Sequence, residues 1–92
     1  METRRLLITG QVQGVGFRHH TVKAAQKLGI VGWVRNHRDG AIEAVITGSD
    51  EQIAAMIDWA RIGPASAEVN GITVEQIDPP IDYAGFAQRE TV

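Results

Sequence analysis

Residues 10–18 read GQVQGVGFR and follow an apolar run, residues 5–9, that is rich in branched side chains. A short run of this kind, ended by a glycine, predicts a buried central strand. From Phe17 onward apolar residues recur at helical spacing as far as Leu28, and Gly29 is typical of a helix end. This stretch therefore predicts a strand, a glycine-rich loop and an amphipathic helix in close succession.

The loop within this stretch has the features of an anion cradle. Gly14 and Gly16 let the backbone adopt positive φ or approach a ligand closely, at positions where a Cβ would clash, so that successive N–H groups turn inward. The helix start adds unpaired N–H groups and the positive end of its dipole. Arg18 adds a planar fork of donors that stays charged. We interpret the loop as a phosphate site; the alternative is a turn that only packs the backbone tightly.

The composition restricts the class of protein. The 92 residues, 43% hydrophobic and 22% charged, are typical of one globular domain spanning residues 1–92. With 9 basic and 11 acidic residues the net charge is -2, and no basic cluster or long apolar run occurs; nucleic acid and membrane are therefore not expected partners. The N-terminus lacks the apolar segment of a signal peptide, which favours the cytoplasm.

The rest of the chain predicts a hairpin, a second helix and further strands. Residues 31–36 and 41–47 flank a turn that ends in Asp-Gly, and alternation within 41–47 indicates one drier face. Residues 49–61 begin with the pattern of a capping box and carry an apolar stripe, so they predict a helix. Strands are also expected at residues 69–77, with a bulge or kink at Asn70-Gly71, and weakly at residues 85–89.

This order of elements predicts an α+β fold, the ferredoxin-like split βαβ sandwich (βαββαβ). Two helices would cover one face of a mostly antiparallel four- or five-stranded sheet, because both must bury their apolar stripes. RNA-recognition domains share this topology but need aromatic residues on the central strands and a basic surface. Residues 5–9 and 41–47 contain no aromatic residue, so this class is set aside.

Asn36 is the second candidate for the site, since it ends the strand to which the helix returns the chain. An uncharged amide can hold a water and direct its lone pair at phosphorus without repelling the phosphate. The alternative is that Asn36 only hydrogen-bonds the following turn.

Other conspicuous side chains are interpreted as structural. Trp33 and Trp59 are expected to pack against other residues. The three histidines lack the spacing of a metal site, and no cysteine is present, so no metal is expected. Four arginines are interpreted as solvated surface charge: Arg4, Arg5, Arg35 and Arg38.

Two motifs resemble those of the acylphosphatase family. GQVQGVGFR is similar to G-x-V-Q-G-V-x-F-R, and GWVRN with Asp39-Gly40 is similar to G-W-V-x-N-x-x-x-G, at the right separation. The resemblance covers essentially the whole chain. It implies a monomeric enzyme without a metal or other cofactor. Its substrate would be a small-molecule acyl phosphate, whose carboxyl-phosphate bond is hydrolysed to a carboxylate and inorganic phosphate.

The resemblance also implies the roles of individual residues. Asn36 would position the attacking water, and Gly14 is expected to matter more than Gly16, which occupies an open position of the motif. The alternative function is a non-catalytic module that binds phosphate or carbamoyl phosphate, as similar domains do within larger maturation enzymes. The phosphate would be bound by the Arg18 side chain and by the backbone N–H groups of the loop: Gln13, Gly14, Val15, Gly16 and Phe17.

Overall fold

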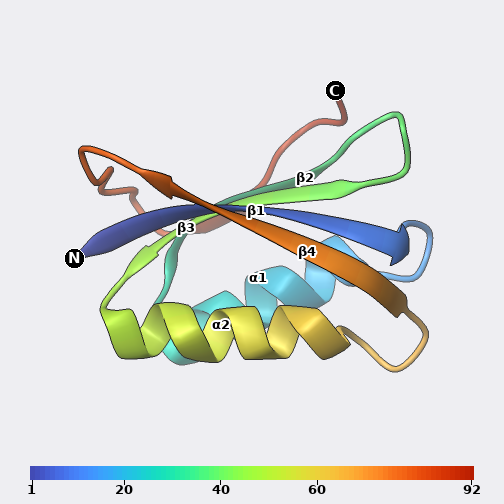
Figure 1. The fold of residues 1–92 in the computed structure, drawn as a ribbon, viewed down its shortest axis with the longest axis horizontal. Coiled ribbons are helices and arrows are strands. Elements are labelled where there is room, and N and C mark those ends of the chain that lie inside the picture. Colours follow the sequence, from blue (N-terminus) through green and yellow to red (C-terminus); the bar gives the residue numbers. More distant parts are fainter.

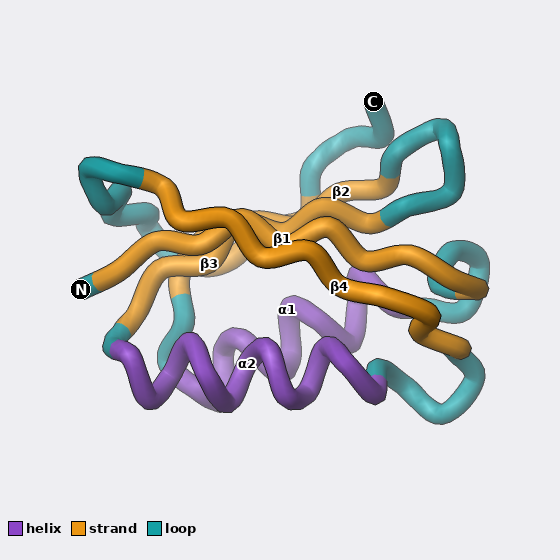
Figure 2. Tube along the Cα trace, in the orientation of Figure 1, coloured by secondary structure: helices purple, strands orange, loops and turns teal.

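The computed structural model describes residues 1–92 and consists of a sheet with a pair of helices on one of its faces (Figure 1). Figure 2 shows the two layers, with the strands above both helices. No helix has the length and apolar character needed to cross a membrane. The elements in chain order are β1 (Glu2–Gln11), α1 (Phe17–Leu28), β2 (Val31–Asn36), β3 (Ile42–Gly48), α2 (Asp50–Ile62), β4 (Glu68–Ile77) and β5 (Phe86–Gln88).

The sheet has five strands in the order β4-β1-β3-β2-β5. The first four pair antiparallel, and β5 runs parallel to β2. This confirms the predicted ferredoxin-like fold. The weak last strand forms as β5, which is shorter than the expected residues 85–89. Beyond it the chain stays beside β2, since Arg89 N–H donates to Val34 O at 2.8 Å and Val92 N–H donates to Asn36 O at 3.1 Å.

The strand β1 is longer than the predicted residues 5–9, because neighbours on both sides hydrogen-bond its backbone. The expected irregularity at Asn70-Gly71 is confirmed by a shift in the β1–β4 register between Thr9 and Gly10. Gly10 has φ 125°, and a Cβ there would lie 2.2 Å from Glu68 O. Only glycine fits this position, so the glycine that ends the apolar run fixes the bulge.

The core lies between the sheet and the two helices. The predicted apolar stripes of the helices contribute to it. The capping box of α2 is confirmed: Ser49 Oγ accepts from Gln52 N–H, and Gln52 Oε1 accepts from Ser49 N–H. Phe17 and Trp59 join the helices edge to face, with ring centroids 5.6 Å apart. This contact packs the first residue of α1 against Trp59 near the end of α2.

The prediction of one drier face on β3 is wrong, because both faces of this central strand are buried. Ile42, Ala44 and Ile46 face the helices within the core. On the face without helices Glu43 is only 4% exposed. Other side chains of the sheet cover this carboxylate, so alternation in sequence did not reveal its burial.

The interpretation of Arg4, Arg5 and Arg35 as solvated charge is also wrong, since all three are partly buried and paired with a carboxylate. Arg4 donates to Glu2, and both Arg5 and Arg35 donate to Glu43. Burial alone would raise the pKa of Glu43, but hydrogen bonds from His37 and the two arginines outweigh it and lower the pKa to about 2. Trp33 packs beneath two guanidinium groups, those of Arg35 at 4.7 Å and Arg89 at 4.5 Å. A charged cluster around Glu43 therefore covers part of the open face of the sheet, the face without helices.

The variant Glu43→Gln is expected to lower the free energy of unfolding at pH 7, with the difference from wild type vanishing toward pH 2. The pKa of Glu43 in the folded protein is about 2, below its ordinary 4.5. Its ionised form therefore stabilises the fold above pH 4.5 and loses this effect as the pH falls toward 2. The shift corresponds to ~3 kcal/mol. Urea unfolding of both proteins between pH 7 and pH 2.5 measures it; a difference independent of pH contradicts it.

Candidate functional site

The glycine-rich loop joins β1 to α1 and has the predicted backbone. Gly14 and Gly16 have φ 74° and 77°, in the left-handed region. Gly16 is the N-cap of α1, provides no side-chain cap, and no acidic residue lies in the first turn. From Gly14 to His19 no backbone N–H donates to a protein acceptor, and the first bond of the helix is His20 N–H to Gly16 O at 3.0 Å. The loop and helix start thus present free donors to an anion.

The positive φ expected of Gly14 and Gly16 is confirmed, whereas no other part of the protein restricts the space at either position. A Cβ at Gly14 has no protein atom within 4 Å, and one at Gly16 meets only the His20 ring at 3.6 Å. Glycine is required by the positive φ at both positions, not by lack of space. The backbone gives no reason to rank Gly14 above Gly16.

The variant Gly14→Ala is expected to destabilise the protein by ~1–2 kcal/mol, the cost of holding an L-residue in the left-handed region. Because the loop can relieve this strain by turning its N–H groups away, inhibition by inorganic phosphate should weaken about tenfold. Gly85→Ala is the matched control, since Gly85 has φ 90° and equally open surroundings outside the loop. It should lower stability and leave phosphate inhibition unchanged. Equal effects of both variants on phosphate inhibition would contradict the role of the loop.

Arg18 follows the loop on the first turn of α1. Its side chain is partly buried and lines a small cavity together with the loop. No carboxylate pairs with its guanidinium, although Arg4, Arg5 and Arg35 each have a carboxylate partner. A partly buried arginine without an internal partner keeps its fork of donors available for an anion.

The cavity has a volume of about 140 Å³ and brings both candidate residues together. Asn36, at the end of β2, lies on its wall with Arg18. Of the predicted phosphate ligands, only Val15 does not line it. Two further residues, His19 and Gln88 of β5, also line it. The position of His19 next to Arg18 was a signal for it, whereas nothing in the sequence pointed to Gln88. The lining residues are Val12, Gln13, Gly14, Gly16, Phe17, Arg18, His19, Asn36 and Gln88.

The side chain of Asn36 does not bond the following turn, which rules out the alternative interpretation. Its Oδ1 is buried and has no hydrogen-bond partner in the protein. The turn is closed by other groups: His37 N–H donates to Ala41 O at 2.8 Å, and Asp39 Oδ1 accepts from Ala41 N–H at 2.9 Å. A buried acceptor without a partner is costly, so Asn36 Oδ1 is available to a group that enters the cavity.

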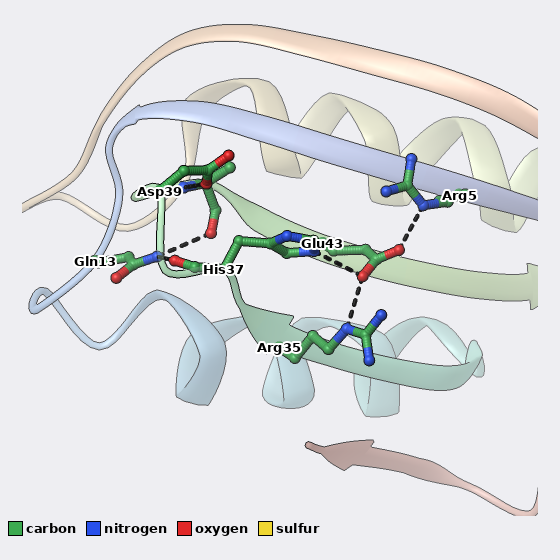
Figure 3. A network of polar contacts seen from close by, with 7 residues as sticks. Arg5, Gln13, Arg35, His37, Asp39 and Glu43 are labelled. Carbon is green, nitrogen blue, oxygen red and sulfur yellow. Dashed lines mark hydrogen bonds and ion pairs between the residues drawn. The ribbon is translucent and has the colours of Figure 1, made fainter. Parts of the chain in front are cut away.

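Gln13 has a second role that the sequence did not suggest. Its Nε2 donates to His37 O at 2.7 Å and to Ala41 O at 2.9 Å (Figure 3). The side chain therefore joins the loop to the β2–β3 turn directly after Asn36. The predicted phosphate contact of Gln13 involves only its backbone, so the two roles are compatible.

The largest hollow of the molecule, about 440 Å³, lies elsewhere. It is formed by α1, Trp59 of α2 and residues 64–66, and includes neither Arg18 nor Asn36. Size alone would therefore select a different site from the one that the predicted residues line. Free donors and an unpartnered acceptor converge only on the smaller cavity.

Comparisons with known proteins agree with the motifs. The sequence model of the acylphosphatase family matches residues 4–88. A protein of Acidovorax sp. (strain JS42) named acylphosphatase is 48% identical over 90 residues, which are 98% of this chain and 92% of that protein. The crystal structure of acylphosphatase from Bacillus subtilis has a TM-score of 0.93 and 28% identity, covering 97% of this chain and 99% of that one. Full-length HypF in its phosphate- and nucleotide-bound form has a TM-score of 0.87 and 28% identity, covering 98% of this chain but 12% of that one.

Proposed function

Because this chain belongs to the acylphosphatase family, we propose that the cavity between the loop and Asn36 is where it hydrolyses acyl phosphates. One observation carries this assignment. The unpaired guanidinium of Arg18, the free N–H groups of the loop and the unpartnered Oδ1 of Asn36 all border the same 140 Å³ cavity. A cavity of this size suits a phosphoryl group and a water and leaves the acyl group outside.

The chemistry of acyl phosphates suits so small a site. The leaving group is a carboxylate whose conjugate acid has a pKa of about 4, so it departs without protonation by a general acid. Water oxygen forms a bond to phosphorus while the bond from phosphorus to the carboxyl oxygen breaks, and the carboxylate takes the electron pair. The proton of the water passes to the phosphate or to solvent.

Arg18 and the loop serve the phosphoryl group in this proposal. Charge on the equatorial oxygens persists in the transition state, so fixed donors aimed at them lower the barrier. The guanidinium binds two of the three equatorial oxygens at once, and the N–H groups of the loop face the third. The helix dipole of α1 adds to the same field, because no acidic side chain in its first turn opposes the phosphate.

Asn36 serves the water. Its Oδ1 accepts a hydrogen bond from the nucleophile and turns a water lone pair toward phosphorus. A neutral amide does this without repelling the phosphate, whereas a carboxylate in its place would. The lack of a protein partner for Oδ1 supports this role.

The alternative, a module that only binds phosphate or carbamoyl phosphate, is not favoured. The HypF likeness covers a small part of a larger protein. The acylphosphatases of Acidovorax and Bacillus subtilis match this chain over nearly their full lengths. Location in the cytoplasm and a monomeric state stay predictions; cell fractionation and light scattering test them.

Release of phosphate from a simple aryl acyl phosphate, with excess chelator, tests the proposed function. Multiple turnovers in chelator are expected, since the proposed steps need no metal. Strict dependence on a metal, or binding of phosphate without turnover, would contradict the proposal and favour the binding module.

A further inference from the structure

The cluster around Glu43 lies on the face of the sheet without helices, next to the turn that contains His37 and Asp39 (Figure 3). Three side chains donate to its carboxylate: Arg5 Nε from β1, Arg35 Nε from β2 at 2.7 Å, and His37 Nε2 at 2.9 Å. Arg5 and Arg35 belong to strands whose positions the sheet already fixes. His37 lies just beyond the last residue of β2, so its contact with Glu43 holds a segment outside the strands.

His37 therefore connects the cluster to the cavity. Its ring is held by Glu43, while its carbonyl accepts from Gln13 Nε2 at 2.7 Å. Asn36 immediately precedes His37, and Gln13 belongs to the phosphate loop. His37 thus links Asn36, whose amide is proposed to position water, to the loop proposed to bind phosphate.

We propose that Glu43 is a positioning residue of this enzyme, which acts through His37 to hold Asn36 at a fixed distance from the phosphate loop. The inference rests on the proposed function of the cavity. Glu43 holds the ring of His37, and Gln13 joins the carbonyl of the same residue to the phosphate loop. The two contacts therefore act in series between the sheet and the loop. A displacement of about 1 Å in a reacting group is enough to lower a rate by up to 10²-fold.

The contact between Glu43 and His37 is suited to a permanent support. The Glu43 carboxylate is ionised and only accepts hydrogen bonds, so the hydrogen lies on His37 Nε2. Neutral and protonated imidazole both donate from this atom. Glu43 is 4% exposed, which shields the hydrogen bond from competing water.

The variant His37→Phe is expected to lower kcat for an aryl acyl phosphate about tenfold, with KM and inhibition by phosphate changed less than twofold. Phenylalanine removes the donor but keeps the ring volume at a side chain that is 25% exposed. The loop and Arg18 still bind phosphate, whereas Asn36 loses its fixed position. Steady-state kinetics measure whether kcat falls while KM stays unchanged. Circular dichroism spectra that match those of the wild type show that the variant is folded.

Two further variants make the test specific. His37→Gln keeps a donor near the position of Nε2 and should restore most of kcat. Arg5→Gln also removes a partner of Glu43, but Arg5 neither lines the cavity nor contacts His37, so this variant should lower stability and leave kcat unchanged. A purely structural role of the cluster predicts instead that Arg5→Gln and His37→Phe lower kcat alike.

The link through Gln13 has its own measurement. If His37 and Gln13 act along one path, Gln13→Ala combined with His37→Phe should lower kcat no further than the more damaging single variant. Multiplied effects would overturn the path through Gln13.

Arg18→Ala, assayed in parallel, separates the two proposals. Wild-type kcat in His37→Phe together with an inactive Arg18→Ala would overturn the positioning role alone. Full activity of Arg18→Ala would overturn the assignment of the cavity itself.

Discussion

Arg18→Ala is expected to lower kcat/KM for an aryl acyl phosphate by about 10²–10³-fold, the loss that follows removal of one preorganised donor, about 3–4 kcal/mol. The guanidinium has no internal partner to release, so the variant should fold with little change in stability. Inhibition by inorganic phosphate should weaken as well, because Arg18 binds the phosphoryl group in both ground and transition states. Phosphate-release kinetics and phosphate inhibition measure the two effects.

Two variants control for charge and for geometry. Arg61→Ala removes an exposed arginine of α2 that also lacks an ion pair and lies outside the cavity; its kinetics should match the wild type. Arg18→Lys keeps the charge without the planar fork, and should recover part of the loss. Near wild-type hydrolysis by Arg18→Ala would remove the basis of the site.

Asn36→Ala is expected to lower kcat about as strongly as Arg18→Ala, by 10²-fold or more, while leaving inhibition by inorganic phosphate nearly intact. The reason is that positioning a water serves the transition state and adds nothing to phosphate binding. Removing Oδ1 also removes a buried acceptor without a partner, so the free energy of unfolding should not fall sharply. Kinetics, phosphate inhibition and urea unfolding together measure this pattern.

Asn36→Asp is the matched variant, since it has nearly the same shape and adds a negative charge. It should lose turnover and also weaken phosphate inhibition, because the carboxylate faces the bound anion across the cavity. Weakened phosphate inhibition with normal turnover in Asn36→Ala would contradict this role. It would show that Asn36 binds phosphate and does not position the water.

The sequence predicted those features that depend on local backbone conformation. Gly14 and Gly16 indicated a loop with positive φ, Ser49 and Gln52 indicated a capped helix start, and the order of elements indicated the sheet. These signals succeed because turn and cap preferences arise within a few residues. The placement of Arg18 and Asn36 on one cavity followed from the topology, since α1 returns the chain to β2.

Contacts between strands distant in sequence were not predictable in this way. Arg5, Arg35 and His37 meet Glu43 only through the β1–β3 and β2–β3 registers, so separate charges along the chain resembled solvated surface residues. The clamp from Gln13 to the β2–β3 turn depends on the same tertiary arrangement. Alternation on β3 failed for a related reason, because a central strand covered by neighbouring side chains is buried on both faces.

Hydrolysis in water enriched in ¹⁸O tests whether water attacks phosphorus, as the roles proposed for Arg18 and Asn36 require. An acyl phosphate is turned over once in labelled water with chelator, and the products are examined by ³¹P NMR and mass spectrometry. If water attacks phosphorus, the label enters inorganic phosphate and the carboxylate stays unlabelled, which is the expected result. Label in the carboxylate would show attack at the acyl carbon and contradict the proposed roles of Arg18 and Asn36.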